Sequence, residues 1–151
     1  MLSVNDNHTD TRHYFASHNH VALHNRRILI VEDEALVAMM IEDFLRDAGA
    51  EIVGTVGSVA EALYLIDLVA ADDGLDGAVL DINLAGETAT PIADRLTTLG
   101  VPFLFATGYG DARDVSQHAA APIIHKPFAF AQLVTAVGSL TCANRSETVR
   151  P

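Results

Sequence analysis

The chain has 151 residues, about the length of one domain, and half of them are hydrophobic, which is enough for one buried core. It carries 9 Lys and Arg residues against 20 Asp and Glu residues, a formal net charge of −11. A field of this sign repels nucleic acid phosphates and anionic membrane surfaces, so the composition argues against direct nucleic acid binding.

No feature of the sequence directs the chain into or across a membrane. Residues 1–15 lack the positively charged start and apolar run of a signal peptide. No apolar stretch approaches the length of about 18 residues that spans a bilayer. Cys142 is the single cysteine, so no disulfide can form within the chain. We therefore expect a cytoplasmic protein without membrane insertion.

Residues 1–25 are polar and show no sustained periodicity, which predicts a flexible leader. The leader holds five histidines: His8, His13, His18, His20 and His24. They could bind a transition metal, but their irregular spacing fits a solvated tail better, because a metal site needs ligands held at fixed geometry.

Two apolar patterns alternate through residues 26–140. Short runs rich in β-branched residues have the length of buried strands, and the segments between them repeat apolar residues every three or four positions, as amphipathic helices do. The expected elements are strands at 28–31, 52–56, 78–80, 103–106 and 122–124, and helices at 36–48, 58–69, 91–99, 113–120 and 130–140. The helix at 113–120 has few large apolar residues.

Local signals support several of these boundaries. Gly49 follows the first helix as a C-terminal cap, and Pro91 stands where a first helical turn accepts proline. Ser58 and Glu61 have the spacing of a capping box at the start of the second helix.

The alternation of strands and helices predicts a doubly wound α/β fold with a five-stranded parallel sheet. In this architecture, ligands bind beyond the carboxyl ends of the strands, near the point where the strand order reverses. We expect residues 26–140 to form the domain and residues 141–151, which are short and polar, to form a tail.

Polar side chains follow four of the predicted strands. Glu32 and Asp33 follow the first strand, Asp81 the third, Thr107 the fourth and Lys126 the fifth. A lone acid after a strand is usually a helix cap or a solvated turn, but this combined set suits phosphoryl transfer to a carboxylate. Asp81 would be the nucleophile, Mg²⁺ would lie among the acids, and the hydroxyl and the ammonium group would contact phosphoryl oxygens.

Residues 26–140 resemble the receiver domain of two-component response regulators of the single-domain type. The resemblance rests on the stretches ILIVEDE, VLDINL, FATGY and HKPF, in that order. It implies a flavodoxin-like fold with Asp81 as the phosphorylation site. It also implies a Mg²⁺ site formed by Glu32, Asp33, Asp81 and the backbone carbonyl of Asn83.

The resemblance further implies how the protein works and with whom. Thr107 and Lys126 would contact the phosphoryl group, and the Lys126–Pro127 bond would be cis, which aims the lysine. A sensor histidine kinase or a phosphotransfer protein would supply the phosphoryl group, and the protein would be a signalling switch rather than an enzyme. Since only 11 residues follow Leu140, we expect no output domain and an output through protein contacts.

The segment after the fourth strand departs from the common receiver pattern. Ile123 stands where many receivers carry a switching aromatic residue, and we interpret it as a core strand residue. The stretch from Phe105 to Tyr109 resembles a subclass defined by a Phe-Ala-Thr-Gly stretch and a nearby Tyr, which also lacks that aromatic residue. We therefore expect Gly108 and Tyr109 to form a switch loop, with an ordinary half-exposed tyrosine as the alternative.

Other classes of function share parts of this pattern. A haloacid-dehalogenase-type phosphatase also uses an aspartate after a parallel strand, but it needs a second acid where Asn83 stands, and no cap insertion is visible. A degenerate receiver would use the same surface as a fixed binding module without phosphorylation. The two differ in whether Mg²⁺ and a small-molecule phosphodonor change an amide or fluorescence signal of the protein. A dinucleotide-binding domain is disfavoured, because no Gly-x-Gly-x-x-Gly follows the first strand.

Overall fold

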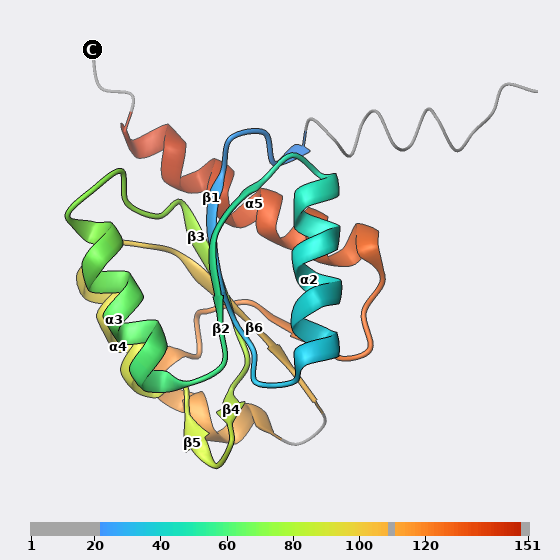
Figure 1. The fold of residues 1–151 in the computed structure, drawn as a ribbon, viewed down its shortest axis with the longest axis vertical. Helices are drawn as coiled ribbons and strands as arrows, with labels where there is room; N and C mark the ends of the chain where they lie inside the picture. The colour runs from blue at the N-terminus through green and yellow to red at the C-terminus, as the bar shows by residue number, and fades with distance from the viewer. Residues whose placement is uncertain (1–21, 109–110, 149–151) are drawn as a thin grey trace, which may run out of the picture.

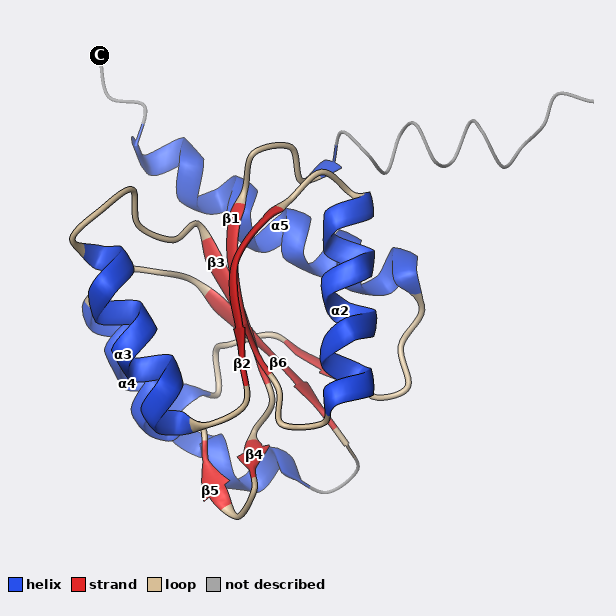
Figure 2. Cartoon of the chain, viewed as in Figure 1, coloured by secondary structure: helices blue, strands red, loops and turns tan. Residues whose placement is uncertain are grey.

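The computed structural model describes residues 22–108 and 111–148, so most of the predicted leader lies outside the described residues. Their centre is a parallel sheet in the strand order β2-β1-β3-β6-β7, which confirms the predicted five-stranded architecture (Figures 1 and 2). Its strands are β1 (Arg27–Val31), β2 (Glu51–Val56), β3 (Gly77–Leu80), β6 (Phe103–Thr107) and β7 (Ile123–His125).

The sheet order determines where a ligand can bind. The chain moves from β1 outward to β2, and then returns past β1 to build β3, β6 and β7 on the other side. All four strand pairings are parallel, so the carboxyl ends of the strands share one edge. The strand order reverses between β1 and β3, which places the expected crevice beyond their carboxyl ends.

Helices cover both faces of the sheet. They are α2 (Ala35–Asp47), α3 (Val59–Ala70), α4 (Thr90–Thr98), the 3₁₀ helix η1 (Asp111–His118) and α5 (Phe130–Thr148). Helices α2 and α5 pack on one face, and α3 and α4 lie on the other (Figure 1). None of the described helices is long and apolar enough to cross a membrane.

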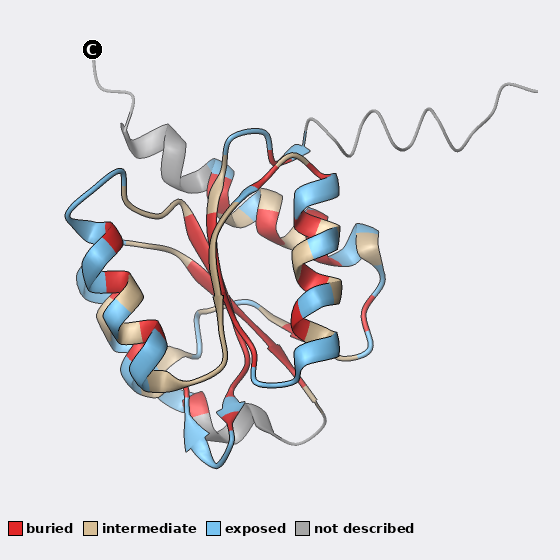
Figure 3. Ribbon diagram, viewed as in Figure 1, coloured by how far each residue is buried: buried red, intermediate tan, exposed pale blue. Residues whose placement is uncertain are grey.

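Alternate strand residues supply the two halves of the core, as the period of two in a strand requires. Ile28 and Ile30 of β1 pack with α2 and α5, whereas Leu29 and Val31 pack with α3 and α4. Figure 3 shows the strands of the sheet largely buried, with the outer faces of the helices exposed. A sheet buried on both faces explains the nearly continuous apolar runs of the strand sequences.

Most of the local signals are confirmed. Ser58 caps α3 by accepting a bond from the N–H of Glu61 at 3.2 Å. The Glu61 carboxylate returns a bond to the N–H of Gly57, also at 3.2 Å, so this half of the capping box is shifted by one residue. Gly49 follows the end of α2 with a φ of 96°, and Pro91 lies in the first turn of α4.

The helix predicted at 113–120 takes a different form. Residues Asp111–His118 form a 3₁₀ helix that is interrupted at Val115, where φ is −122° and ψ is 31°. Val115 is 2% exposed, while Ser116 and Gln117 are exposed. With a single large apolar residue, this segment cannot present the wide apolar stripe that stabilises an amphipathic α-helix.

The folded part of the chain extends beyond both predicted ends of the domain, residues 26 and 140. Helix α5 continues past Leu140 to Thr148. Thr141 is buried, and its hydroxyl is satisfied by donating to the carbonyl of Val137 at 2.9 Å. Leu23, placed in the leader by the sequence, is fully buried in the core beside α2 and α5. Residues 1–21 and 149–151 lie outside the described residues, so the leader and the tail stay predictions there.

A short hairpin between β3 and α4 was not predicted. It consists of β4 (Asn83–Leu84) and β5 (Glu87–Thr88), joined by Ala85 and Gly86 with φ angles of 53° and 92°. Two positive φ angles are typical of the tight turn that matches strand twist. The usual Asn-Gly or Asp-Gly signal for such a turn is absent, because alanine occupies its first position.

Candidate functional site

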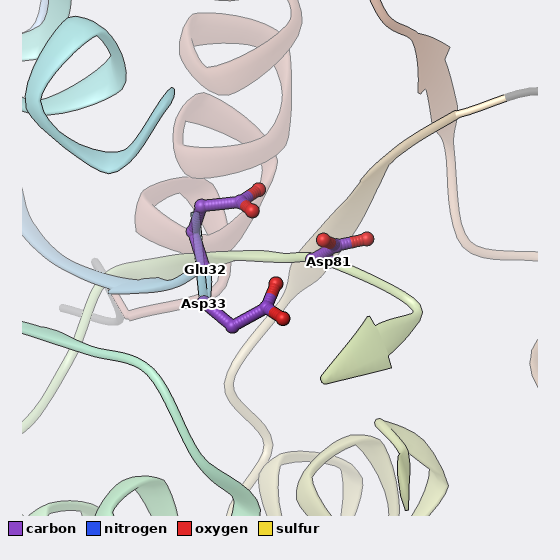
Figure 4. A group of neighbouring side chains, drawn as sticks. All are labelled: Glu32, Asp33 and Asp81. Atoms are coloured by element: carbon purple, nitrogen blue, oxygen red, sulfur yellow. The ribbon is translucent and has the colours of Figure 1, made fainter. Parts of the chain in front are cut away.

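The structure brings together three carboxylates at the reversal point of the sheet. Glu32 and Asp33 follow β1 and Asp81 follows β3, and one oxygen from each lies within 4.8 Å of the others. Because Val31 pairs with Leu80, the residues after these two strands emerge side by side. In Figure 4 the three side chains point into the same space.

Lys126 joins two of these acids. Its Nζ donates to Glu32 Oε2 at 2.6 Å and to Asp81 Oδ2 at 3.2 Å. The lysine follows β7, its backbone N–H donates to the carbonyl of Thr107 at 2.8 Å, and the predicted cis bond to Pro127 is confirmed. The carboxyl ends of β1, β3, β6 and β7 therefore converge on one site.

Burial makes this acidic cluster electrostatically strained. Glu32 is 3% exposed, and this burial raises the pKa of Glu32 to about 7. The bond from Lys126 lowers this pKa, whereas the charge of Asp81 raises it further. Burial alone would lower the pKa of Lys126, but its bonds to Glu32 and the charge of Asp81 outweigh this and raise that pKa. One lysine thus offsets the charge of three acids only in part.

A hollow of about 280 Å³ opens above the acids. Its lining residues are Asp33, Glu34, Asp81, Asn83, Ala85, Gly86, Gly108 and Lys126. Most of the residues predicted for the site from the sequence therefore face one cavity of a size suited to a hydrated ion and a phosphoryl group. Glu32 does not line the hollow itself but is bonded to Lys126, which does.

The remaining predicted residues lie at the edge of this hollow or outside the described chain. Thr107 is fully buried at the end of β6, next to Gly108. Ile123 is half-buried and packs against the core, which confirms its interpretation as a core strand residue. Tyr109 lies outside the described residues, so its role in a switch loop stays a prediction.

Two contacts of the site had no signal in the sequence, because both come from backbone groups. The N–H of Glu34 donates to Glu32 Oε1 at 3.1 Å, and the N–H of Ala85 donates to Asp33 Oδ2 at 3.1 Å. A backbone donor is independent of residue type, so only the path of the chain reveals it.

The donor set at the hollow fits Mg²⁺. The acidic cluster offers carboxylate oxygens from Glu32, Asp33 and Asp81, and Asn83 also lines the hollow. Mg²⁺ prefers oxygen ligands from one or two carboxylates while it retains several waters. Burial, and after it the charge of Asp81, raises the pKa of Glu32, and a divalent ion in the cluster would oppose both effects by favouring the charged carboxylate.

This pKa predicts that Mg²⁺ binding weakens in acid. At a pH below its pKa of about 7, Glu32 holds a proton in the metal-free protein. An ion that needs the negative charge of Glu32 must displace that proton. We expect affinity to be about tenfold weaker one pH unit below this pKa than well above it. Calorimetric titration across this range measures the effect, and Glu32→Gln, neutral throughout, should flatten it. A wild-type affinity that does not change with pH would contradict the argument.

Comparisons with known proteins agree with this geometry. Residues 28–138 match the family described as the response regulator receiver domain. The transcriptional regulatory protein PdtaR of Mycobacterium tuberculosis is 31% identical over 117 residues, which cover 74% of this chain and 55% of PdtaR. The chain therefore spans about half the length of this curated relative.

Solved structures give the same result. The solution structure of SdrG from Sphingomonas melonis Fr1 has a TM-score of 0.63 and 44% identity, covering 77% of this chain and 97% of SdrG. A second SdrG structure, from Pseudomonas melonis Fr1 and described as the BeF3-activated conformation, has a TM-score of 0.64 and 43% identity, covering 76% of this chain and 95% of that one. A receiver protein from Sinorhizobium medicae WSM419 has a TM-score of 0.68 and 30% identity, covering 79% and 96% of the two chains.

Proposed function

The chain belongs to the response regulator receiver domain family, and from this premise we propose that it accepts a phosphoryl group on Asp81 with the help of Mg²⁺. The observation that carries the proposal is the cluster of Glu32, Asp33 and Asp81 with Lys126 bonded across it. A single lysine between buried acids, beneath an open hollow, is an arrangement suited to receiving an anionic group beside a cation.

Each residue of the cluster has a role in this proposal. The carboxylates of Glu32, Asp33 and Asp81 and the carbonyl of Asn83 would hold Mg²⁺, which, when bound, offsets the charge of the phosphoryl oxygens. A carboxylate oxygen of Asp81 forms the new bond to phosphorus, while the bond from phosphorus to the donor atom breaks and its electron pair leaves with the donor.

The position of Lys126 supports a role as a donor to the phosphoryl group. Its Nζ lies 3.2 Å from Asp81 Oδ2, so a phosphoryl group on that side chain lies within reach of its N–H donors. The buried hydroxyl of Thr107 supports the proposal as a second donor, since it ends the strand that adjoins β3. Lys126 and Thr107 would then donate to the phosphoryl oxygens in place of their present partners.

The segment after Thr107 is the proposed moving part. It leads through Gly108 to η1, where Val115 alone of the described side chains is fully buried. At its other end, His118 bonds to Asp94 of α4 at 2.7 Å. A helix whose sequence holds one large apolar residue can be displaced at low cost in free energy, which suits a two-state switch. That SdrG has a BeF3-activated conformation supports such a second state here.

We propose a sensor histidine kinase or a phosphotransfer protein as the phosphodonor. Leu36 and Met39 of α2, which begins directly beyond the acidic cluster, are 81% and 61% exposed. Large apolar side chains exposed at the edge of a charged hollow favour contact with a protein over contact with a small substrate alone. The switched surface would then act in two-component signal transduction through protein contacts.

The experiment is to incubate the protein with acetyl phosphate and Mg²⁺ and to measure its intact mass. We expect one phosphoryl group to be incorporated, to be removed by hydroxylamine as an acyl phosphate is, and to be absent when EDTA removes the ion. Autophosphorylated kinases then replace acetyl phosphate to identify the donor. If a known receiver is labelled under the same conditions and this chain is not, the chain is a degenerate receiver that binds without phosphorylation.

A further inference from the structure

The β4–β5 hairpin forms one wall of the acidic hollow. Asn83, Ala85 and Gly86 of this hairpin line the cavity, and the N–H of Ala85 donates to Asp33 Oδ2 at 3.1 Å. We propose that this hairpin positions Asp33 for Mg²⁺, which makes Ala85 a positioning residue of the metal site. The inference rests on the proposed function, because it concerns the same ion.

Asp33 differs from the other two acids in how it is held. Glu32 and Asp81 are buried and both accept bonds from Lys126, whereas Asp33 is exposed. Among the described residues, Ala85 is the only hydrogen-bond partner of its side chain. An exposed aspartate without such a bond samples several rotamers, so this contact selects the one that points at the hollow.

The backbone of Ala85 is held in an unfavourable conformation. Its φ of 53° is uncommon for a residue with a Cβ, and only one other described non-glycine residue, Asn25, has a positive φ. Such conformations persist where surrounding contacts hold them, and they cluster at functional sites. At this turn, the strained residue is the one whose N–H contacts a carboxylate of the acidic cluster.

Contacts on both sides hold the turn in place. The side-chain oxygen of Asn83 accepts a bond from the N–H of Gly86 at 2.9 Å. Leu84 is 1% exposed and anchors the hairpin in the core, and a bond of 2.8 Å from the N–H of Ala89 to the carbonyl of Ile82 closes its base. The hairpin is therefore fixed to the body of the domain, and it can act as a rigid support for Asp33.

The bond leaves Asp33 able to bind an ion. It uses Oδ2, and Oδ1 remains available to a cation in the hollow. A bond from a backbone N–H to a charged carboxylate is stronger than a neutral one, and groups that orient metal ligands in this way change metal affinity about 10- to 100-fold. Loss of the Ala85 contact should therefore appear in the affinity for Mg²⁺, before any phosphoryl transfer.

The test is to measure Mg²⁺ binding to Ala85→Val by calorimetry. A β-branched residue opposes the positive φ, so we expect the N–H to turn away from Asp33 and the affinity to fall about tenfold. Ala85→Asn is the rescuing variant, because asparagine accepts this conformation and keeps the N–H. It should bind Mg²⁺ at least as tightly as the wild type does.

Asn25→Val is the matched control. Asn25 has a φ of 60° and lies before β1, at the end of the sheet opposite the acids. The same substitution there imposes similar backbone strain without touching the hollow. We expect a lowered Tm with unchanged Mg²⁺ affinity, whereas Ala85→Val should change both.

The outcomes separate this inference from the proposed function. If the wild type binds Mg²⁺ and Ala85→Val binds it equally well, the hairpin does not position Asp33. Equal weakening in Ala85→Val and Asn25→Val also overturns the inference, because general loosening then explains the effect. A wild type that binds no Mg²⁺ refutes the metal site itself. Should Ala85→Val not fold, Asn83→Ala takes its place, because it keeps the backbone carbonyl but removes the bond to Gly86. The Mg²⁺ affinity of Asn83→Ala must then be lower than that of the wild type.

Discussion

Asp81→Asn should abolish phosphoryl incorporation and leave the metal-free protein at least as stable as the wild type at neutral pH. The amide is a poor nucleophile, so no acyl phosphate forms. The substitution also removes one negative charge from a buried cluster in which the charge of Asp81 raises the pKa of Glu32. Lys126 keeps its 2.6 Å bond to Glu32, so we expect a gain of up to about 1 kcal/mol.

Intact-mass measurement after treatment with acetyl phosphate and Mg²⁺ reports the first effect, and thermal unfolding in EDTA reports the second. Asp43→Asn is the matched control, because Asp43 is an exposed acid on α2 outside the hollow. It should be labelled as the wild type is. Undiminished labelling of Asp81→Asn would mean that another residue accepts the phosphoryl group.

The sheet and the edge that carries the site were predictable from the sequence because both follow from strong local patterns. Buried parallel strands need continuous apolar runs, and β1, β3 and β6 each show one. The acids and the lysine directly follow such runs, and parallel strands place their carboxyl ends together. The convergence of Asp81 and Lys126 therefore needed no knowledge of tertiary contacts.

The parts that were not predictable depend on backbone groups or on single contacts. The β4–β5 hairpin is held by Leu84 and by the side chain of Asn83, while its turn lacks a typical turn sequence. The extension of α5 includes Thr141, a buried polar residue whose hydroxyl donates to a carbonyl of its own helix, so the polar sequence did not indicate that the helix continues. In η1, too few apolar residues were present to distinguish a 3₁₀ helix from an α-helix.

Lys126→Met should destabilise the metal-free protein by about 3 kcal/mol and prevent stable phosphorylation. Methionine keeps the apolar stem but removes the charge, which leaves Glu32 and Asp81, 3% and 7% exposed, without the cation that joins them. Removing one partner of a buried ion pair is costly because the other charge stays buried. The phosphoryl group would also lose a donor that lies within reach of Asp81.

Mg²⁺ distinguishes this electrostatic cause from a loss of packing. A divalent ion in the hollow replaces the missing positive charge, so saturating Mg²⁺ should restore more stability to Lys126→Met than it adds to the wild type. Lowering the pH should also restore stability to Lys126→Met, because Glu32 takes up a proton more readily once Lys126 is absent. Lys126→Arg, which keeps the charge, should retain most of the stability in EDTA. Equal stability of Lys126→Met and the wild type in EDTA at neutral pH would show that the lysine does not balance the acids, and the electrostatic account of the site would fail with it.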